Sequence, residues 1–139
     1  MSVVFFTDRD LGKDFPRILR EAGLTVERHD DHFRPDTPDE EWLAEVGRRG
    51  WIAITHDKRI RYKPNELAAV MAHRVSLLVL IGRPPMAELA TSFVATLERI
   101  LRFTREHRPP YIAKLYRPSA AVLARNSAAQ GEIRLWYPA

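Results

Sequence analysis

The segment Trp51-Ile-Ala-Ile-Thr-His-Asp57-Lys-Arg-Ile-Arg61 joins a strand-like run to a basic loop. Residues 51–55 have the character of a buried strand, and Asp57 follows almost directly after them. In an open sheet of parallel strands, ligands bind in the crevice outside the carboxyl ends of the strands. Asp57 is therefore a candidate site residue, provided that other parts of the chain bring polar side chains to the same edge.

The rest of the chain alternates between predicted strands and helices. Further strands are predicted at residues 3–6, 24–28 and 75–81, and helices at residues 15–22, 38–47 and 64–73. At the second helix, Thr37 and Glu40 have the spacing of a capping box. Strict alternation of strand and helix predicts an α/β fold with a mostly parallel sheet and helices on its faces.

The chain of 139 residues is expected to form one domain, residues 1–139. Its core is predicted at residues 3–82, followed by one long helix at residues 86–108 and a C-terminal extension at residues 111–139. In the extension, residues 111–117 and 132–137 have strand character, and the second of these is expected to be an antiparallel edge strand. Residues 118–130 carry no assignment.

Composition is that of an ordinary globular protein, with 45% hydrophobic residues. Apolar runs such as residues 77–81 are far shorter than the roughly 20 residues that span a bilayer, so no membrane segment is expected. The first residues do not resemble a signal peptide, and cysteine is absent, which excludes disulfides and thiolate metal sites. A cytoplasmic location is expected.

The charges are segregated along the chain. Residues 1–60 hold 13 acidic and 10 basic side chains, whereas residues 61–139 hold 5 acidic and 12 basic ones. An acidic half that holds cations and a basic half that holds phosphates would suit a nucleic-acid enzyme. A merely solvated basic surface is the competing interpretation.

Three acidic segments are predicted to converge at one edge of the sheet. Asp8 follows the first strand, Asp57 follows the third, and the helix that begins near Pro38 starts at the same edge. Clustered carboxylates repel one another unless they are protonated or bridged by a cation, and Mg²⁺ prefers oxygen ligands. The candidate metal ligands are Asp8, Asp57 and at least one of Asp39, Glu40 and Glu41 at the start of that helix, with Asp10 as a further candidate. A bound ion of this kind would activate water for hydrolysis of a phosphodiester.

The motifs Phe-Phe-Thr-Asp8-Arg-Asp10-Leu, Pro-Asp39-Glu40-Glu41-Trp-Leu and Ile-Ala-Ile-Thr55-His-Asp57-Lys-Arg-Ile resemble those of PIN-like domains over about residues 3–82. These domains are relatives of the ribonucleases that form the toxin half of VapBC toxin–antitoxin pairs. The resemblance implies a ribonuclease that uses Mg²⁺ or Mn²⁺, with Asp8, Asp39 and Asp57 as its catalytic acids. It also implies a protein antitoxin as partner and a possible homodimer.

The chain departs from the family after the fourth predicted strand, where Gly82-Arg-Pro-Pro85 stands in place of a further acid. This departure puts a second metal position and catalytic strength in doubt, although Asp10 could compensate. The predicted contacts to RNA phosphates are Lys58, Arg59, Arg61 and Lys63, with Arg9 and Lys13 as additional candidates.

Two other functions fit parts of the pattern. A phosphoacceptor receiver domain would phosphorylate Asp57 and hold Mg²⁺ with Asp8 and Asp10, but it needs a Ser or Thr after the fourth strand and a Lys after the fifth. Here Gly82 follows the fourth strand and Lys114 falls mid-strand. A non-catalytic PIN-like module that binds RNA or protein is the third possibility. His29, His32 and His56 lack zinc-ligand spacing and are interpreted as surface or substrate-contacting residues.

Overall fold

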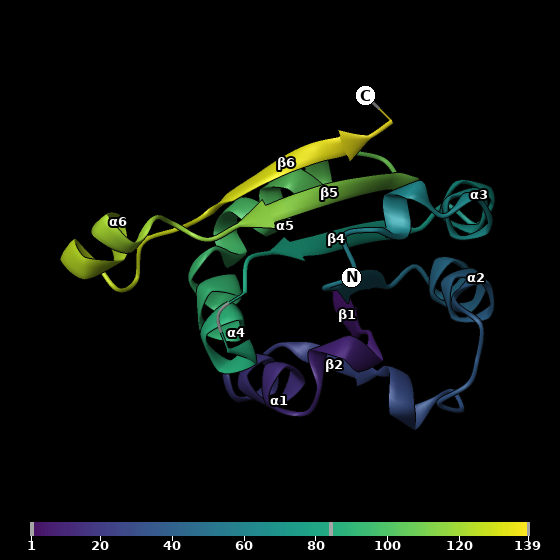
Figure 1. The fold of residues 1–139 in the computed structure, drawn as a ribbon, viewed down its shortest axis with the longest axis horizontal. Coiled ribbons are helices and arrows are strands. Elements are labelled where there is room, and N and C mark those ends of the chain that lie inside the picture. Colours follow the sequence, from purple (N-terminus) through teal and green to yellow (C-terminus); the bar gives the residue numbers. More distant parts are fainter. Residues whose placement is uncertain (1, 84, 139) are drawn as a thin grey trace.

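A computed structural model describes residues 2–83 and 85–138 of the chain. It contains one sheet whose strands are ordered β2-β1-β3-β4-β5-β6. The strands are β1 (Val4–Thr7), β2 (Thr25–Arg28), β3 (Ile52–Thr55), β4 (Ser76–Ile81), β5 (Tyr111–Tyr116) and β6 (Glu132–Tyr137). The first five strands are parallel to one another and β6 is antiparallel to β5, which confirms the predicted fold class (Figure 1).

Helices cover both faces of this sheet. The α-helices are α1 (Asp14–Glu21), α2 (Asp39–Arg49), α3 (Pro64–Ala72), α4 (Met86–Ala95), α5 (Leu97–Glu106) and α6 (Ala120–Arg125). Short 3-10 helices are η1 (Arg9–Leu11), η2 (His29–Asp31) and η3 (Ile60–Tyr62). None of the helices among the described residues is long and apolar enough to cross a lipid bilayer.

Two apolar layers hold the helices against the sheet. On one face, α1, α4 and α5 pack over a core that includes Phe5, Phe15 and Phe93. On the other face, α2 and α3 pack over a core that includes Phe6 and Trp42. Successive side chains of a strand point to opposite faces, so the neighbours Phe5 and Phe6 supply one core each.

The order of the strands places a switch point between β1 and β3. From β1 the chain passes through α1 to β2 on one side, whereas from β3 it passes through α3 to β4 on the other side. A crevice opens outside the carboxyl ends of two strands whose connections diverge in this way. Asp8 and Asp57 follow these two strands, so the fold brings them to the crevice as the sequence predicts.

The prediction of a single long helix at residues 86–108 is wrong. The chain forms α4 and α5 with a break at Thr96, and the two helices meet at an angle (Figure 1). The buried Thr96 hydroxyl donates to the carbonyl of Ser92 and accepts from the backbone N–H of Gly131. A threonine that hydrogen-bonds back into its own helix favours a bend, and here the same hydroxyl also fixes the chain that enters β6.

Two smaller differences concern helix ends. The capping box is absent, because Pro38 is the residue before the first turn of α2 and no side chain caps that helix. Within the unassigned residues 118–130, the short helix α6 forms after Ser119, whose side chain accepts from the N–H of Val122. An amphipathic pattern is too short there to be detected in the sequence.

Candidate functional site

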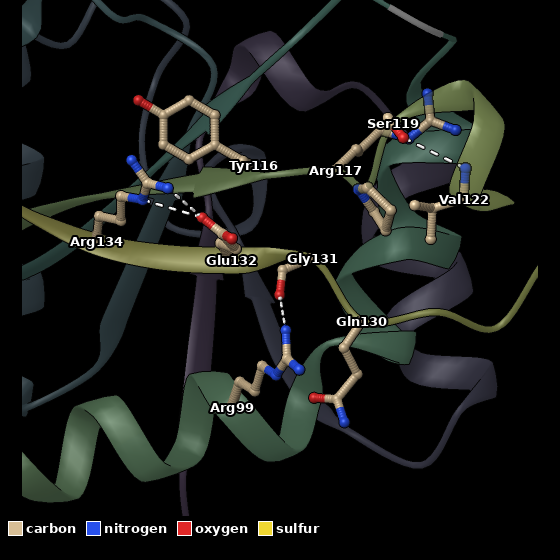
Figure 2. A pocket seen from close by; sticks show the side chains of 10 residues that line it. Arg99, Tyr116, Arg117, Ser119, Val122, Gln130, Gly131, Glu132 and Arg134 are labelled. Carbon is tan, nitrogen blue, oxygen red and sulfur yellow. Dashed lines mark hydrogen bonds and ion pairs between the residues drawn. The ribbon is translucent and has the colours of Figure 1, made fainter.

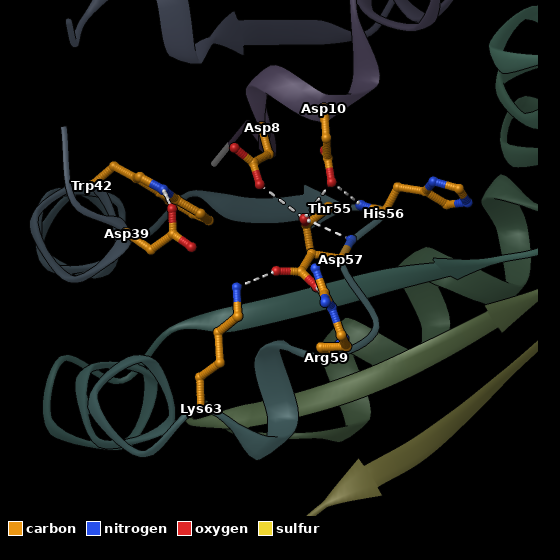
Figure 3. Close-up of polar contacts among 9 residues, drawn as sticks. All are labelled: Asp8, Asp10, Asp39, Trp42, Thr55, His56, Asp57, Arg59 and Lys63. Carbon is orange, nitrogen blue, oxygen red and sulfur yellow. Dashed lines mark hydrogen bonds and ion pairs between the residues drawn. The ribbon is translucent and has the colours of Figure 1, made fainter. Parts of the chain in front are cut away.

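Four acidic side chains border one pocket of about 400 Å³ at the switch point. Asp8 and Asp10 come from the end of β1 and from η1, Asp57 comes from the loop after β3, and Asp39 begins α2. Their side chains approach one another from separate segments (Figure 3). Glu40 and Glu41, the neighbouring candidates on α2, are exposed and do not line this pocket.

Thr55, the last residue of β3, connects three of these acids. Its hydroxyl oxygen lies 2.9 Å from Oδ2 of Asp8 and 3.2 Å from Oδ2 of Asp10, and it accepts a hydrogen bond from the N–H of Asp57. A hydroxyl has one proton to donate, so it cannot serve two ionised carboxylates at once. A proton on one of the two aspartates, or a cation beside them, would relieve this competition.

The ionisation of these two carboxyl groups agrees with that conclusion. Burial of Asp8 and the nearby charge of Asp10 raise the pKa of Asp8 to about 7, although hydrogen bonds from Thr55 and from the N–H of Arg9 oppose the change. Asp10 is exposed as a whole residue, yet desolvation of its carboxyl group raises its pKa against the hydrogen bonds from His56 N–H and Thr55. Ionisation of both carboxyl groups is therefore unfavourable unless a cation lies beside them.

Asp57 has the opposite character. Its Oδ2 lies 2.7 Å from Nζ of Lys63, and its Oδ1 accepts from the N–H of Arg59. Partial burial would raise the pKa of Asp57, but these two hydrogen bonds outweigh burial and lower it. The pair leaves Asp57 ionised and Lys63 protonated, because the same contact raises the pKa of Lys63.

Asp39 lies at the other side of the pocket. The indole N–H of Trp42 donates to its Oδ1 at 2.9 Å, one turn further along α2. Trp42 is fully buried, so this bond fixes the carboxylate of Asp39 relative to the core of the protein. Of the three acids at the start of α2, Asp39 is the one that the structure places in the pocket.

The predicted RNA-contacting residues have different positions. Lys58 and Arg59 are exposed beside the pocket, and Lys63 pairs with Asp57. Arg61 turns away, because its guanidinium lies over the rings of Tyr62 and Tyr137. Of the two additional candidates, Arg9 lines the pocket and forms an ion pair with Asp30. Lys13 is exposed at the start of α1 and does not line the pocket.

The three candidate histidines also have different surroundings. His29 is only 3% exposed, so the prediction that it is a surface residue is wrong, whereas a contact with substrate stays a prediction because His29 lines the pocket. Its ring packs among Phe6, Phe33 and Trp42, and burial lowers its pKa. His56 lies at the far side of Asp10, with Nε2 2.6 Å from the carbonyl oxygen of Gly82. His32 packs against Trp51 outside the pocket.

A family model described as a PIN like domain matches residues 3–82. The chain belongs to the PIN-like domain family. The matched residues extend from β1 to the end of β4 and include the four aspartates that border the pocket. The PIN-like family is part of a superfamily in which nucleases are common. Comparison with curated proteins and with solved structures gave no match.

The pocket has the donor chemistry of a divalent-cation site. Across residues 2–83 and 85–138, no three His, Asp or Glu side chains form a ready-made set around one ion. Mg²⁺, however, is often held by one or two carboxylates together with waters and substrate phosphates. Asp8 and Asp10 accept hydrogen bonds only from uncharged groups, and among the described residues neither forms an ion pair, so this pair fits that kind of site. Asp57 is instead paired with Lys63, and Asp39 accepts from the indole N–H of Trp42.

Sequence reasoning treated Thr55 as a strand-end residue and missed its central position. It also assigned Lys63 only to RNA and did not anticipate its pairing with Asp57. The available signal was the spacing Thr55-His-Asp57, because a hydroxyl two residues before an acid can accept that acid's backbone N–H. Its contacts with Asp8 and Asp10 span more than forty residues and have no local signal.

Proposed function

We propose that this protein is a metal-dependent ribonuclease whose active site is the pocket formed by Asp8, Asp10, Asp39 and Asp57. The observation that carries the proposal is the Asp8 and Asp10 pair, which shares one hydroxyl at the switch point of a PIN-like domain. Crowded carboxyl groups with raised pKa values attract a hard cation, and an open edge of the sheet gives a polymer access to them.

Asp8 and Asp10 would hold Mg²⁺ or Mn²⁺, with Asp39 and Asp57 at the edges of the same pocket. When bound, the ion supplies neutralisation of the negative charge that develops as a phosphodiester is cleaved, and it makes water more acidic. Thr55 orients the two carboxylates through its hydroxyl. Lys63 places a positive charge beside Asp57, where it can pair with a substrate phosphate.

The surroundings of Asp57 favour hydrolysis over phosphoryl transfer to this residue. The carboxylate that would be phosphorylated in a receiver domain is held by Lys63 and by the N–H of Arg59. Lys114, the lysine of the fifth strand, lies with Nζ 4.0 Å from the centre of the Trp136 ring and does not line the pocket. The receiver function therefore has no specific support among these contacts.

We also propose, from the resemblance to toxin ribonucleases, that the protein is the toxin of a toxin–antitoxin pair in the cytoplasm. A protein antitoxin would cover the acidic pocket, and the toxin would act as a homodimer. Induced expression of the wild-type protein in bacteria should then arrest growth, and expression of Asp8→Asn should not. Growth arrest by both proteins would contradict a toxin that acts through this pocket.

Cleavage of labelled single-stranded RNA by the purified protein tests the ribonuclease function. We expect cleavage with Mg²⁺ or Mn²⁺, loss of cleavage with EDTA, and a rate lower by about two orders of magnitude in Asp8→Asn. Asp14→Asn is a matched control, since Asp14 is an exposed aspartate on α1 outside the pocket, and it should cleave normally. Cleavage that survives Asp8→Asn would refute the site, and absence of cleavage would favour a non-catalytic binding module.

A further inference from the structure

The strands β5 and β6 present an aromatic and basic surface on the side away from α5. We define this aromatic–basic face as Arg61, Tyr62, Lys114, Tyr116, Arg134 and Trp136. Figure 2 shows Tyr116 and Arg134 on one side of the two strands, whereas Arg99 of α5 approaches from the other side. Figure 1 likewise shows α5 behind β5 and β6. Trp136 is partly buried and packs against the edge of the apolar core under α2 and α3.

Cations and rings alternate across this face. Nζ of Lys114 lies 4.0 Å from the centre of the Trp136 ring, and the guanidinium of Arg134 lies 5.6 Å from that of Tyr116. Arg61 lies over Tyr62, whose ring meets Trp136 edge to face at 5.8 Å. Tyr62 is 69% exposed, so much of its ring is open to a ligand.

Rings interleaved with cations fit a single-stranded nucleic acid, and on this face the Tyr62 ring is exposed while Tyr116 and Trp136 are half-buried. Unpaired bases stack on aromatic side chains, while lysine and arginine contact the phosphates between them. The face carries three cations, and Glu132, the only acid within β5 and β6, is paired with Arg134. This charge favours a polyanion over a purely apolar protein surface.

The face continues into the acidic pocket through η3. Tyr62 and Arg61 belong to η3, and the next residue, Lys63, reaches Asp57 at 2.7 Å. Figure 3 shows the turn of η3 between the acidic residues and the strands β5 and β6. A strand of RNA that crosses η3 would therefore have bases on the face and a phosphate near the carboxylates.

We propose that the aromatic–basic face binds single-stranded RNA, with a base stacked on Tyr62 and phosphates held by Lys114 and Arg134. The inference rests on the proposed ribonuclease function for the identity of its ligand. It extends that function, because none of the six residues lines the acidic pocket.

Fluorescence anisotropy with a short labelled adenine-rich RNA, measured in EDTA so that cleavage does not interfere, tests this face. We expect Tyr62→Ala to weaken binding by about 5-fold or more, whereas Tyr62→Phe keeps the ring and binds like the wild type. Arg134→Ala should weaken binding further than Arg48→Ala. Arg48 is a matched control, because both side chains are 68% exposed and both pair with a glutamate.

The outcomes separate this inference from the ribonuclease function. Binding that depends on Tyr62 and Arg134 in a protein without cleavage activity supports the face and refutes the ribonuclease. Equal binding by the wild type, Tyr62→Ala and Arg134→Ala overturns the face even if the protein cleaves RNA. If the wild type binds no single-stranded RNA, RNA binding by this face is also overturned, and a protein partner becomes the alternative ligand.

Discussion

Oδ2 of Asp8 lies 2.9 Å from the hydroxyl oxygen of Thr55, the residue that ends the neighbouring strand β3. The same hydroxyl reaches Asp10 and accepts the backbone N–H of Asp57. A single buried side chain thus ties together the acids that arrive from two strands. The candidate site is organised around this hydroxyl as much as around the carboxylates.

Replacement of Thr55 by valine should disrupt the site while the shape of the core is retained. Valine has the same branching as threonine but leaves Asp8, Asp10 and the N–H of Asp57 without their shared partner. We expect the free energy of unfolding to fall by about 1–3 kcal/mol and RNA cleavage to be lost. Thr55→Ser keeps the hydroxyl and should retain cleavage. Urea unfolding and RNA cleavage check both variants, and an active Thr55→Val would contradict the role of the hydroxyl.

The raised pKa of Asp8 predicts a pH dependence of stability. The pKa of Asp8 is about 7 in the folded protein, against an ordinary value of 3.8, so the folded state binds more protons between these values. Stability should therefore fall as the pH rises from about 4 to about 7. Asp8→Asn removes this contribution, and its stability relative to the wild type should rise between pH about 5 and about 8. Urea denaturation of both proteins in EDTA at pH about 5 and about 8 measures this difference. A difference in stability between the two proteins that is the same at both pH values would refute the raised pKa of Asp8.

Removal of the Lys63 ammonium should make the carboxylate of Asp57 available to bind a cation. Lys63→Met breaks the contact between Nζ and Oδ2 of Asp57 but keeps most of the apolar side chain. Because both groups are partly solvated, stability should change by less than about 1 kcal/mol, whereas Mg²⁺ should bind more tightly. Lys58→Met, in the same loop at an exposed position, is the control. Titration calorimetry distinguishes them, and weaker Mg²⁺ binding by Lys63→Met would contradict the prediction.

The close approach of α2 to the end of α3 makes Gly47 a sensitive position. A Cβ atom at Gly47 would lie 2.2 Å from the carbonyl oxygen of His73. Replacement of glycine by alanine within a helix normally stabilises by about 1 kcal/mol. Here the two helices must separate, so Gly47→Ala should instead destabilise by about 1–3 kcal/mol. Thermal or urea unfolding gives the sign, and a stabilised variant would show that this contact is looser than described.

The sequence was sufficient for those features that depend on local pattern. Apolar runs and turn residues predict β1 to β4 and the helices between them, and parallel strands then place Asp8 and Asp57 at one edge. The edge strand β6 was also predicted from its alternation. These features follow from periodicity, which a single sequence displays.

The rest depends on contacts between distant segments. Continuous helical periodicity hides the break at Thr96, because the partner of its hydroxyl is Gly131 in the chain before β6. Lys63 and Arg61 are similar basic residues in one short loop, yet one reaches Asp57 and the other reaches Tyr137. No local rule distinguishes them, since the choice depends on which strands flank the loop after folding.

Binding of Mg²⁺ to the metal-free protein at pH about 8, measured by titration calorimetry, tests the central claim most directly. At this pH, above the pKa of about 7 for Asp8, most of the Asp8 side chains are ionised, so the wild type and the exposed control Asp14→Asn should bind the ion equally. Asp8→Asn should lose measurable binding, because half of the carboxylate pair is removed. Equal binding of Mg²⁺ by Asp8→Asn and the wild type would contradict a cation site at Asp8 and Asp10.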